Sequence, residues 1–151
     1  MAIISEQTNS FMDQIRSNIQ ASGQYATGKS SESIYSLISE SGGIYSIEVN
    51  AKPFFSVLET GRKPTPDKKP SYSMIENIKE WTNAKGLPES AAWAIAVNIN
   101  KKGTKLWQQG GRQDIYTNEK EPFIKTLFEE LAKEIGDEYF KNMKDSFKEV
   151  A

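Results

Sequence analysis

The feature that most constrains the fold of this chain is a long hydrophobic stripe near its C-terminus. Apolar residues recur there at spacings of three and four, and three phenylalanines widen the stripe: Ile124, Leu127, Leu131, Ile135, Tyr139, Met143 and Phe147, with Phe123, Phe128 and Phe140 beside them. This spacing predicts an amphipathic helix that begins at Pro122 and runs to about residue 149. Such a helix spans about 42 Å, which is longer than one face of a domain of this size. Part of the stripe should therefore extend past the core, where packing against a partner is as well supported as internal packing.

The composition indicates one globular domain and excludes several kinds of site. The chain has 151 residues, of which 37% are hydrophobic and 26% charged, and it contains neither cysteine nor histidine. Without these residues there is no disulfide framework, no triad that uses histidine and no common zinc site. The start, Met1–Glu6, lacks the features of a secretion signal, and the longest apolar run, Ala91–Val97, is too short to span a membrane. We therefore expect one domain over residues 1–151, with no catalytic residue, metal, cofactor or membrane partner.

Charge is distributed unevenly along the chain. Residues 1–60 contain 3 Lys/Arg and 6 Asp/Glu, residues 61–113 contain 10 and 4, and residues 114–151 contain 6 and 10. The net charge of −1 thus conceals a basic middle between two acidic ends. The basic middle is either ordinary solvated surface or a region that meets an acidic surface, such as a neighbouring copy or nucleic acid.

The segment Gly23–Ser30 fits the phosphate-binding pattern G-x-x-x-x-G-K-[ST] at every position. A P-loop needs a buried strand before it and a helix after it, because these elements aim its N–H groups at the phosphates. The preceding residues 5–20 instead have the apolar spacing of a helix, with Ser5 as its expected N-cap, and the following residues favour a strand. We interpret Gly23–Ser30 as a helix-to-strand connector and keep nucleotide binding as the alternative.

Residues 31–51 are predicted to form a β-hairpin. Tyr45, Ile47 and Val49 alternate with polar residues, which is the period of a strand with one buried face. The partner strand is expected over Ser33–Ser39, and the turn over Glu40–Gly43, where two glycines permit positive φ.

The segment after the hairpin combines a short helix with a basic loop. Proline suits the first position of a helix and glycine the residue just past its end, so a helix of about two turns is predicted from Pro53 to Gly61. Its apolar side chains are expected to be pressed into the core: Phe54, Phe55, Val57 and Leu58. The following Arg62–Pro70 contains three prolines and four cations, which predicts a stiff, exposed arm.

Two further helices are predicted in the middle of the chain. Ser73–Glu76 has the form of a capping box, and Gly86 ends the helix that it begins. The next helix, from Glu89 to about Lys101, has so little polar surface that we expect it to be the most buried. The pair also suits a helix-turn-helix, but a recognition helix needs polar and basic side chains that the second helix mostly lacks. Core packing is the favoured interpretation, and a DNA-binding regulator is the alternative.

Residues 103–121 are expected to be irregular. A connection of this length in a compact domain is usually functional or mobile. It contains Trp107 and Arg112, which are residue types favoured at interface hot spots. Either these residues contact a partner, or Trp107 folds back over the core. The loops 62–71 and 103–121 are thus the segments expected to protrude from the domain.

The order of these motifs resembles the small neck and tail-completion proteins of tailed bacteriophages, often grouped as head–tail joining or minor tail proteins. The matching features span roughly residues 25–135, in this order: Thr27-Gly28-Lys29 with Ser33-Ile34, Phe54-x-x-x-Leu58-Glu59-Thr60-Gly61-Arg62, Pro70, Ile75-x-x-Ile78-x-x-Trp81, Lys85-Gly86-Leu87, Ala94-Ile95, Ile99-x-x-x-Gly103-Thr104 and Glu121-Pro122-Phe123. The proline- and lysine-rich arm, the loop around Trp107 and the length of the final helix depart from the family's usual pattern.

The resemblance implies an α+β fold, in which a small antiparallel sheet made by the central hairpin is packed by helices, with a long C-terminal amphipathic helix. It also implies a structural virion protein rather than an enzyme, made in the host bacterial cytoplasm and assembled as a ring in the phage neck or tail, where it joins or seals the DNA path. The expected partners are identical copies, portal or connector and tail proteins, and the phosphate backbone of passing double-stranded DNA. The residues expected to contact a neighbouring subunit or another partner are Arg62, Lys63, Lys68, Lys69, Trp107 and Arg112.

Overall fold

The computed structural model describes residues 2–24 and 27–149, with side chains up to residue 144. Its elements follow in the order α1 (Ala2–Ala21), α2 (Lys29–Glu32), β1 (Tyr35–Ser41), β2 (Ile44–Asn50), the 3-10 helix η1 (Pro53–Ser56), α3 (Val57–Thr60), α4 (Tyr72–Ala84), α5 (Ala91–Lys102), α6 (Lys105–Gln108) and α7 (Lys120–Glu149). The fold is α+β, as the sequence predicts, because β1 and β2 pair antiparallel and helices make up most of the rest. The side chain of Phe147 lies outside the described residues, as do Tyr25 and Ala26 of the P-loop-like segment.

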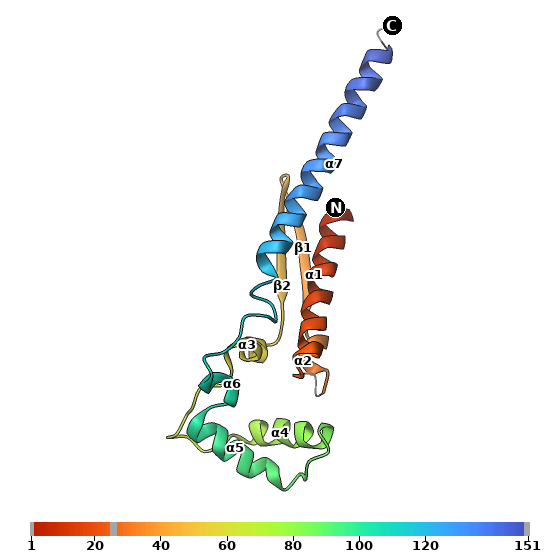
Figure 1. Ribbon diagram of the computed structural model, residues 1–151. Helices are drawn as coiled ribbons and strands as arrows, with labels where there is room; N and C mark the ends of the chain where they lie inside the picture. The colour runs from red at the N-terminus through yellow and green to blue at the C-terminus, as the bar shows by residue number, and fades with distance from the viewer. Residues whose placement is uncertain (1, 25–26, 150–151) are drawn as a thin grey trace.

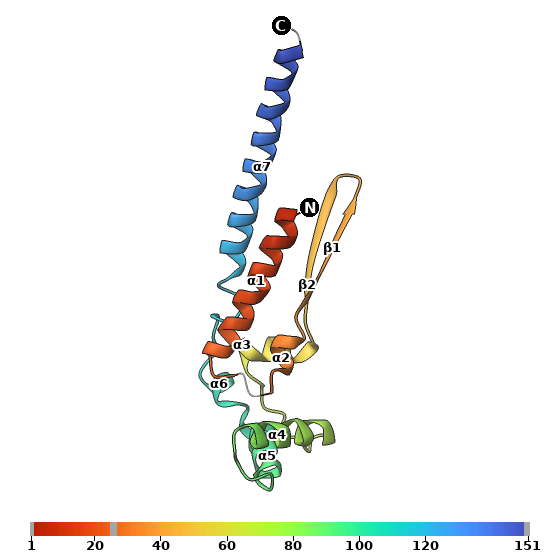
Figure 2. The same ribbon diagram turned by 90° about the vertical axis from the view of Figure 1, so that its right-hand side faces the viewer.

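The molecule is elongated, with its elements in two groups (Figures 1 and 2). The helices α1 and α7 and the β1–β2 hairpin run side by side along the long axis, whereas α4 and α5 lie across one end. The C-terminal part of α7 continues beyond the N-terminus of α1 and beyond the tip of the hairpin. Within the described part of the chain, no helix combines the length and the apolar character needed to cross a membrane.

The main core lies between α1, the start of the hairpin and the segment before α7. Its buried side chains are Met12, Ile15, Ile19, Ile34 and Ile115, with Phe11, Ala51, Phe55, Leu58 and Tyr116 packed against them. The rings of Phe11 and Phe123 stack with their centroids 4.6 Å apart, which joins α1 to α7. The predicted N-cap at Ser5 is wrong, because α1 begins at Ala2 and places Ser5 inside the helix. The helix therefore begins about one turn earlier than the sequence predicted.

The hairpin is longer and less covered than predicted. Glu40 and Ser41 belong to β1, so the turn is confined to Gly42 and Gly43, both with positive φ. The register pairs Ile38 with Ile47. The expectation of one buried face is wrong, because no residue of either strand is fully buried. Alternation in the sequence correctly predicted the strands, but only a small part of the sheet meets α1.

The short helix after the hairpin is confirmed as η1 followed by α3, ending at Gly61. The prediction that its apolar side chains are pressed into the core is wrong for two of the four. Phe54 is 44% exposed and Val57 is also exposed, whereas Glu59 is only 3% exposed. Residues three and four apart share one face of a helix. Phe55, Leu58 and Glu59 therefore face inward together, and Phe54 and Val57 lie outside that face.

The helices α4 and α5 pack against each other at the end of the molecule. Ser71, rather than the predicted Ser73, is the N-cap of α4, and its hydroxyl accepts a hydrogen bond from the Met74 N–H at 3.2 Å. The expectation that α5 is the most buried helix is wrong. It buries one face, through Ala92, Ala96 and Asn100, and leaves Trp93 63% exposed. An apolar sequence could not bury α5 fully here, because α4 is its main helical neighbour.

The final helix is confirmed, although it begins at Lys120 and places Pro122 inside its first turn. The start of its stripe packs on α1, where Leu127 is only 8% exposed. Beyond Leu131 every described side chain of α7 is exposed. The stripe therefore extends past the core, as its length predicted.

Candidate interaction surfaces

The buried carboxylate of Glu59 organises the junction between α3 and the segment before α7. Its Oε1 accepts hydrogen bonds from the N–H groups of Ile115, Tyr116 and Thr117 at 3.1, 2.8 and 2.9 Å, and its Oε2 accepts one from the Thr117 hydroxyl at 2.5 Å. Burial alone raises the pKa of Glu59, but the hydrogen bonds from Thr117, Tyr116 and Ile115 together bring the pKa below its ordinary value. Glu59 is thus an ionised anchor for a turn more than fifty residues away in the chain.

Gly61 lets α6 approach the end of α3 closely. Its φ is 69°, and a Cβ at this position would lie 2.4 Å from the Trp107 nitrogen and 2.7 Å from the Thr104 hydroxyl oxygen. That hydroxyl accepts hydrogen bonds from the N–H groups of Arg62 at 2.9 Å and Trp107 at 3.3 Å, while the Thr104 N–H donates to the Arg62 carbonyl at 2.9 Å. The Leu58–Arg62 motif therefore fixes the position of α6, through contacts of its backbone with Thr104 and Trp107.

Residues 103–121 are not irregular throughout, which corrects the prediction. They contain α6, whose N-cap is Thr104, and the Arg112 N–H donates to the Glu59 carbonyl at 2.8 Å. The cap of α6 is a local contact, because the Thr104 hydroxyl accepts from the N–H of Trp107 three residues later. The contact between Arg112 and Glu59 has no local pattern that could predict it, because these residues are far apart in the chain.

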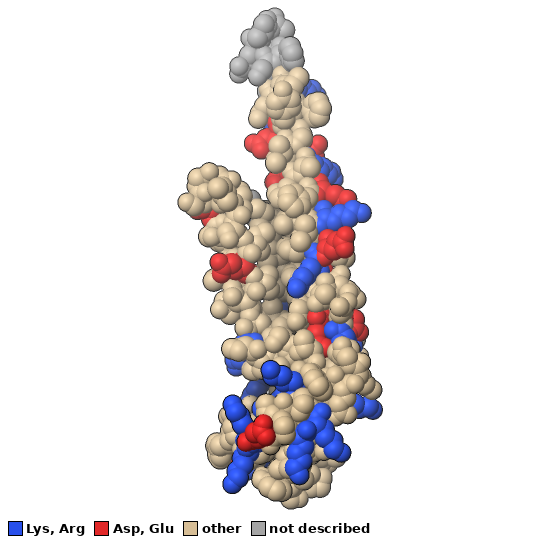
Figure 3. Space-filling view, turned by 90° about the vertical axis from the view of Figure 1, so that its left-hand side faces the viewer, with Lys and Arg blue, Asp and Glu red and all other residues tan. Residues whose placement is uncertain are grey.

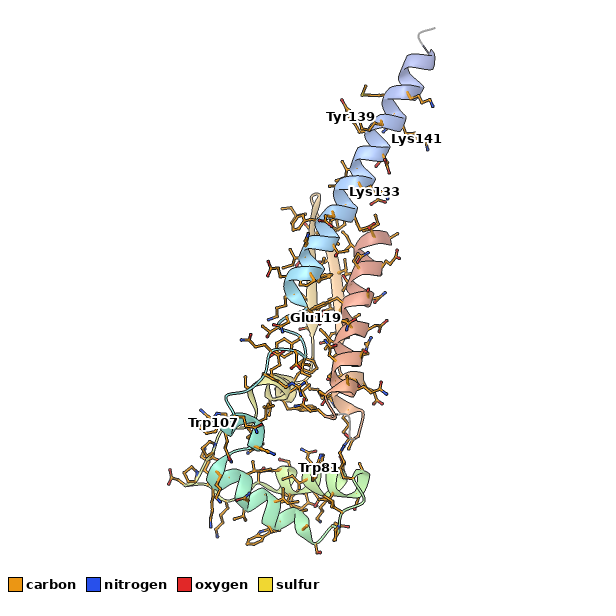
Figure 4. All side chains as sticks on the ribbon, viewed as in Figure 1. Trp81, Trp107, Glu119, Lys133, Tyr139 and Lys141 are labelled. Carbon is orange, nitrogen blue, oxygen red and sulfur yellow. The ribbon has the colours of Figure 1, made fainter. Side chains whose placement is uncertain are left out.

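Trp107 and Arg112 lie around the same open hollow beside Glu59 and Tyr116. The Arg112 guanidinium forms two hydrogen bonds to Asp114, at 2.5 and 2.6 Å, and this contact raises the pKa of Arg112. Trp107 remains partly exposed at the position that Figure 4 labels. Of the predicted contact residues, these two are therefore brought together, and the arginine already has a partner within the chain.

The other four predicted contact residues lie at the α4–α5 end. Arg62, Lys63, Lys68 and Lys69 are all exposed. Their loop is held against α5, because the Thr65 N–H donates to the Asn100 carbonyl at 2.7 Å and the Asn100 amide donates to the Lys68 carbonyl at 2.9 Å. These two bonds fix the direction in which the loop presents its cations.

Three cations that were not predicted as contact residues, Lys101, Lys102 and Lys105, extend this group. They are exposed at the end of α5 and the start of α6. We call the set the basic end: Arg62, Lys63, Lys68, Lys69, Lys101, Lys102 and Lys105. Among the residues that the structure describes, none of the seven has a carboxylate within ion-pair distance. Figure 3 shows blue side chains gathered at this end of the molecule. Lys101 and Lys102 could have been placed at this end from the sequence, because the helix dipole favours cations in the last turn of a helix.

A groove crosses the basic end between the loop and α5. Its lining combines apolar side chains and three lysines with one carboxylate and one amide: Pro66, Asp67, Lys68, Lys69, Pro70, Trp93, Val97, Asn100 and Lys101. Its volume is about 490 Å³. The exposed ring of Trp93 is thus bordered by three lysines, which favours a partner that is both apolar and acidic.

The P-loop-like segment lacks the context of a phosphate site. The helix α1 ends just before it, where a P-loop requires a strand, and α2 after it is a single turn of four residues. The ammonium group of Lys29 forms an ion pair with Glu80 of α4. The lysine that would bind phosphate therefore contacts a carboxylate of the same chain.

Two apolar faces are uncovered, one on α7 and one on the hairpin. On α7 the exposed apolar side chains are Ile124, Phe128, Ile135, Tyr139, Phe140 and Met143, and on the hairpin they include Tyr35, Leu37 and Ile44. Figure 3 also shows a hollow between the hairpin and α7 lined by uncharged residues. Exposed apolar patches of this extent usually mark interaction sites. The sequence predicted the face on α7 but not the one on the hairpin.

Searches against protein-family models, curated proteins and solved structures found no match to this chain. The function of these surfaces is therefore inferred from their geometry and chemistry, together with the motif order given above.

Proposed function

We propose that this chain is a structural virion protein of a tailed bacteriophage, whose identical copies form a ring in the neck or tail. In this role it joins the capsid and portal to the tail and lines or seals the path of the DNA. The observation that carries the proposal is the uncovered outer half of α7, where the apolar stripe continues for several turns without a neighbouring element. An isolated helix with one apolar face is marginal in water, so a partner that covers it is expected.

The Leu58–Arg62 segment, which belongs to the motifs that resemble this family, supports a structural role. Glu59 is fully engaged by backbone and hydroxyl donors, and Gly61 is enclosed by α6. These residues position the loop that carries Trp107 and Arg112, rather than presenting a reactive group to a cavity. Such a framework suits a subunit that must hold contact residues in a fixed geometry.

The distribution of charge supports contacts between different surfaces of identical copies. A ring with cyclic symmetry uses heterologous contacts, in which one patch of a subunit meets another patch of the next. Here the basic end is separated from the acidic segment of α7 along the long axis. Portal and tail proteins, and the phosphates of passing double-stranded DNA, are the further partners that the proposal names.

Electron microscopy of the purified protein tests this proposal directly. We expect ring-shaped particles, and sedimentation velocity should show a single large species at high concentration. A protein that remains monomeric at all concentrations would contradict the ring.

A second test reverses Arg62, Lys63, Lys68 and Lys69 to glutamate, and we expect loss of intact rings and of infectious particles. The matched control reverses four cations that lie away from the basic end and have no carboxylate within ion-pair distance among the described residues: Lys52, Lys85, Lys120 and Lys144.

The two alternative hypotheses predict different measurements. Nucleotide binding through Gly23–Ser30 predicts a shift in melting temperature on addition of ATP or GTP with magnesium. A DNA-binding regulator built on α4 and α5 predicts tight, sequence-dependent gel shifts, whereas the proposed ring protein should bind DNA weakly and with strong salt dependence. No contact in the structure favours either alternative over the ring.

A further inference from the structure

The middle of α7 combines negative charge with uncovered apolar side chains. Residues 129–138 contain five carboxylates and one lysine, and all six charged side chains are exposed. Glu134 and Glu138 share one face of the helix because they are four residues apart. Ile135 and Tyr139, which are 66% and 64% exposed, occupy the neighbouring row of the same helix. This segment therefore presents an apolar row with a carboxylate row beside it.

The spacing of the stripe determines how a partner can cross α7. From Leu127 onward its main members recur every four residues, through Leu131, Ile135, Tyr139 and Met143. A row of this spacing is inclined by about 26° to the helix axis, so it leaves the side that faces α1 as it continues. A coiled coil between two α7 helices requires a repeat of 3.5 residues, which this row does not have. The spacing thus favours a partner that crosses α7 obliquely.

The groove at the basic end has the complementary chemistry. Trp93 supplies an exposed aromatic surface, and Lys68, Lys69 and Lys101 border it without an ion pair among the described residues. The lining also contains the carboxylate of Asp67, so three positive charges and one negative charge leave it basic. Along α5, the groove extends from Trp93 to Lys101, which is about 12 Å. The segment of α7 from Glu134 to Met143 is about 14 Å long by the same rise per residue. The two surfaces match in length, in apolar content and in opposite charge.

We propose that the groove at the basic end of one copy receives the Glu134–Met143 segment of α7 from a second copy. The proposal rests on the proposed function, which makes identical copies the partners of one another. Within one chain the two surfaces lie at opposite ends of the long axis, so they can meet only between copies (Figure 1). Duplex DNA matches the lysines but not the apolar part of the groove, whereas α7 matches both.

A complementary charge reversal tests the contact. Glu134→Lys with Glu138→Lys should place like charges in the interface, and so should Lys69→Glu with Lys101→Glu. We expect each double variant to self-associate at least tenfold more weakly than the parent chain, measured by sedimentation velocity. An equimolar mixture of the two variants should recover association, because the groove of one variant then meets the α7 of the other with opposite charge. A chain with all four substitutions should recover it as well.

The control is Glu129→Lys with Asp137→Lys, which changes the net charge of α7 equally but outside the row of Glu134 and Glu138 and the row of Ile135 and Tyr139. The ion pair that it removes, between Lys125 and Glu129 at 3.9 Å, is exposed. It should retain most of the association of the parent chain. All variants should keep the parent's circular dichroism spectrum and melting temperature, because every substituted side chain is exposed.

The outcomes separate this inference from the proposed function. Rings that persist in both double variants overturn the inference and leave the proposed function standing. Failure of the mixture and of the fourfold variant to recover association shows that the two surfaces do not meet, which also overturns it. If the double variants weaken a closed dimer and the mixture restores it, the contact is supported and the ring is contradicted. If Lys69→Glu with Lys101→Glu abolishes binding of a 30-base-pair duplex but leaves association unchanged, the groove serves nucleic acid and the inference is wrong. A parent chain that stays monomeric contradicts both proposals.

Discussion

The junction around Glu59 and the outer half of α7 differ in the kind of side chain that they bury. The junction buries a charged group, whereas the outer half of α7 leaves apolar groups exposed. At the junction a charged side chain is buried, and every hydrogen bond it needs comes from the same chain. On α7, apolar side chains such as Ile135 and Tyr139 are exposed, and no residue that the structure describes covers them. The junction is therefore complete in a single copy, whereas the apolar face of α7 is not. Substitutions in the first region should change the stability of the monomer, and substitutions in the second should change its association.

The largest loss of stability is expected for Glu59→Ala. The substitution leaves the buried N–H group of Ile115 and three partly buried donors, the N–H groups of Tyr116 and Thr117 and the Thr117 hydroxyl, without their acceptor. Unpaired buried donors are costly, so the free energy of unfolding should fall by about 4 kcal/mol, measured by urea denaturation. Glu59→Gln is the control, because it keeps the volume and one acceptor oxygen and should lose less. Equal losses in the two variants would show that the hydrogen bonds of the carboxylate contribute little.

The next largest effect is expected for Gly61→Ala. The added methyl group would overlap the backbone nitrogen of Trp107, which cannot move without displacing α6. We expect a loss of about 3 kcal/mol, from this overlap together with the strain of a positive φ.

Gly86→Ala is the matched control for this substitution. Gly86 has a φ of 68°, close to the 69° of Gly61, but nothing lies within 4 Å of a Cβ built on it. Gly86→Ala should lower the free energy of unfolding only through the strain of a positive φ, by about 1 kcal/mol. Similar losses for both variants would contradict the close approach of α6.

Local patterns predicted the elements of this fold well, and contacts between distant residues account for what they missed. The stripe of α7 and the alternation in β2 are periodic over many residues, so each predicted its own element. No local pattern indicates that Glu59 receives hydrogen bonds from residues 115–117. By hydrophobicity alone Phe54 was the better candidate for burial, but the spacing of Phe55, Leu58 and Glu59 placed the carboxylate inside.

Local patterns likewise predicted some of the candidate contact residues and missed others. Arg62, Lys63, Lys68 and Lys69 were predicted because prolines and cations in one segment indicate an exposed loop. Lys101 was missed because its helix was expected to be the most buried one. The groove of the basic end could not be predicted, since it depends on the hydrogen bonds that hold residues 65 and 68 against Asn100.

A smaller effect is expected from acid. The pKa of Glu59 is lower in the folded chain than in the unfolded chain, so its contribution to stability is complete above the unfolded value, about 4.5. As the pH falls through that value toward the folded pKa, the unfolded state takes up a proton first and the contribution is lost. The parent chain should therefore lose its advantage in unfolding free energy over Glu59→Gln at acid pH, by about 1.4 kcal/mol for each unit of difference between the two pKa values. An advantage that stays constant between pH 7 and pH 3 would contradict the role of the ionised carboxylate.

The smallest effect on monomer stability is expected for Ile135→Ala in the outer half of α7. Ile135 is 66% exposed, so its truncation creates no cavity and should change the unfolding free energy by less than about 0.5 kcal/mol. Leu127→Ala is the control in the same helix, because Leu127 is 8% exposed and should cost about 2–3 kcal/mol. Self-association should show the reverse order at concentrations where both chains are folded, since Ile135 belongs to the face that the proposed partner would cover. If Ile135→Ala instead destabilised the monomer as much as Leu127→Ala, the outer half of α7 would have to be covered by its own chain, and the contrast with the junction would not hold.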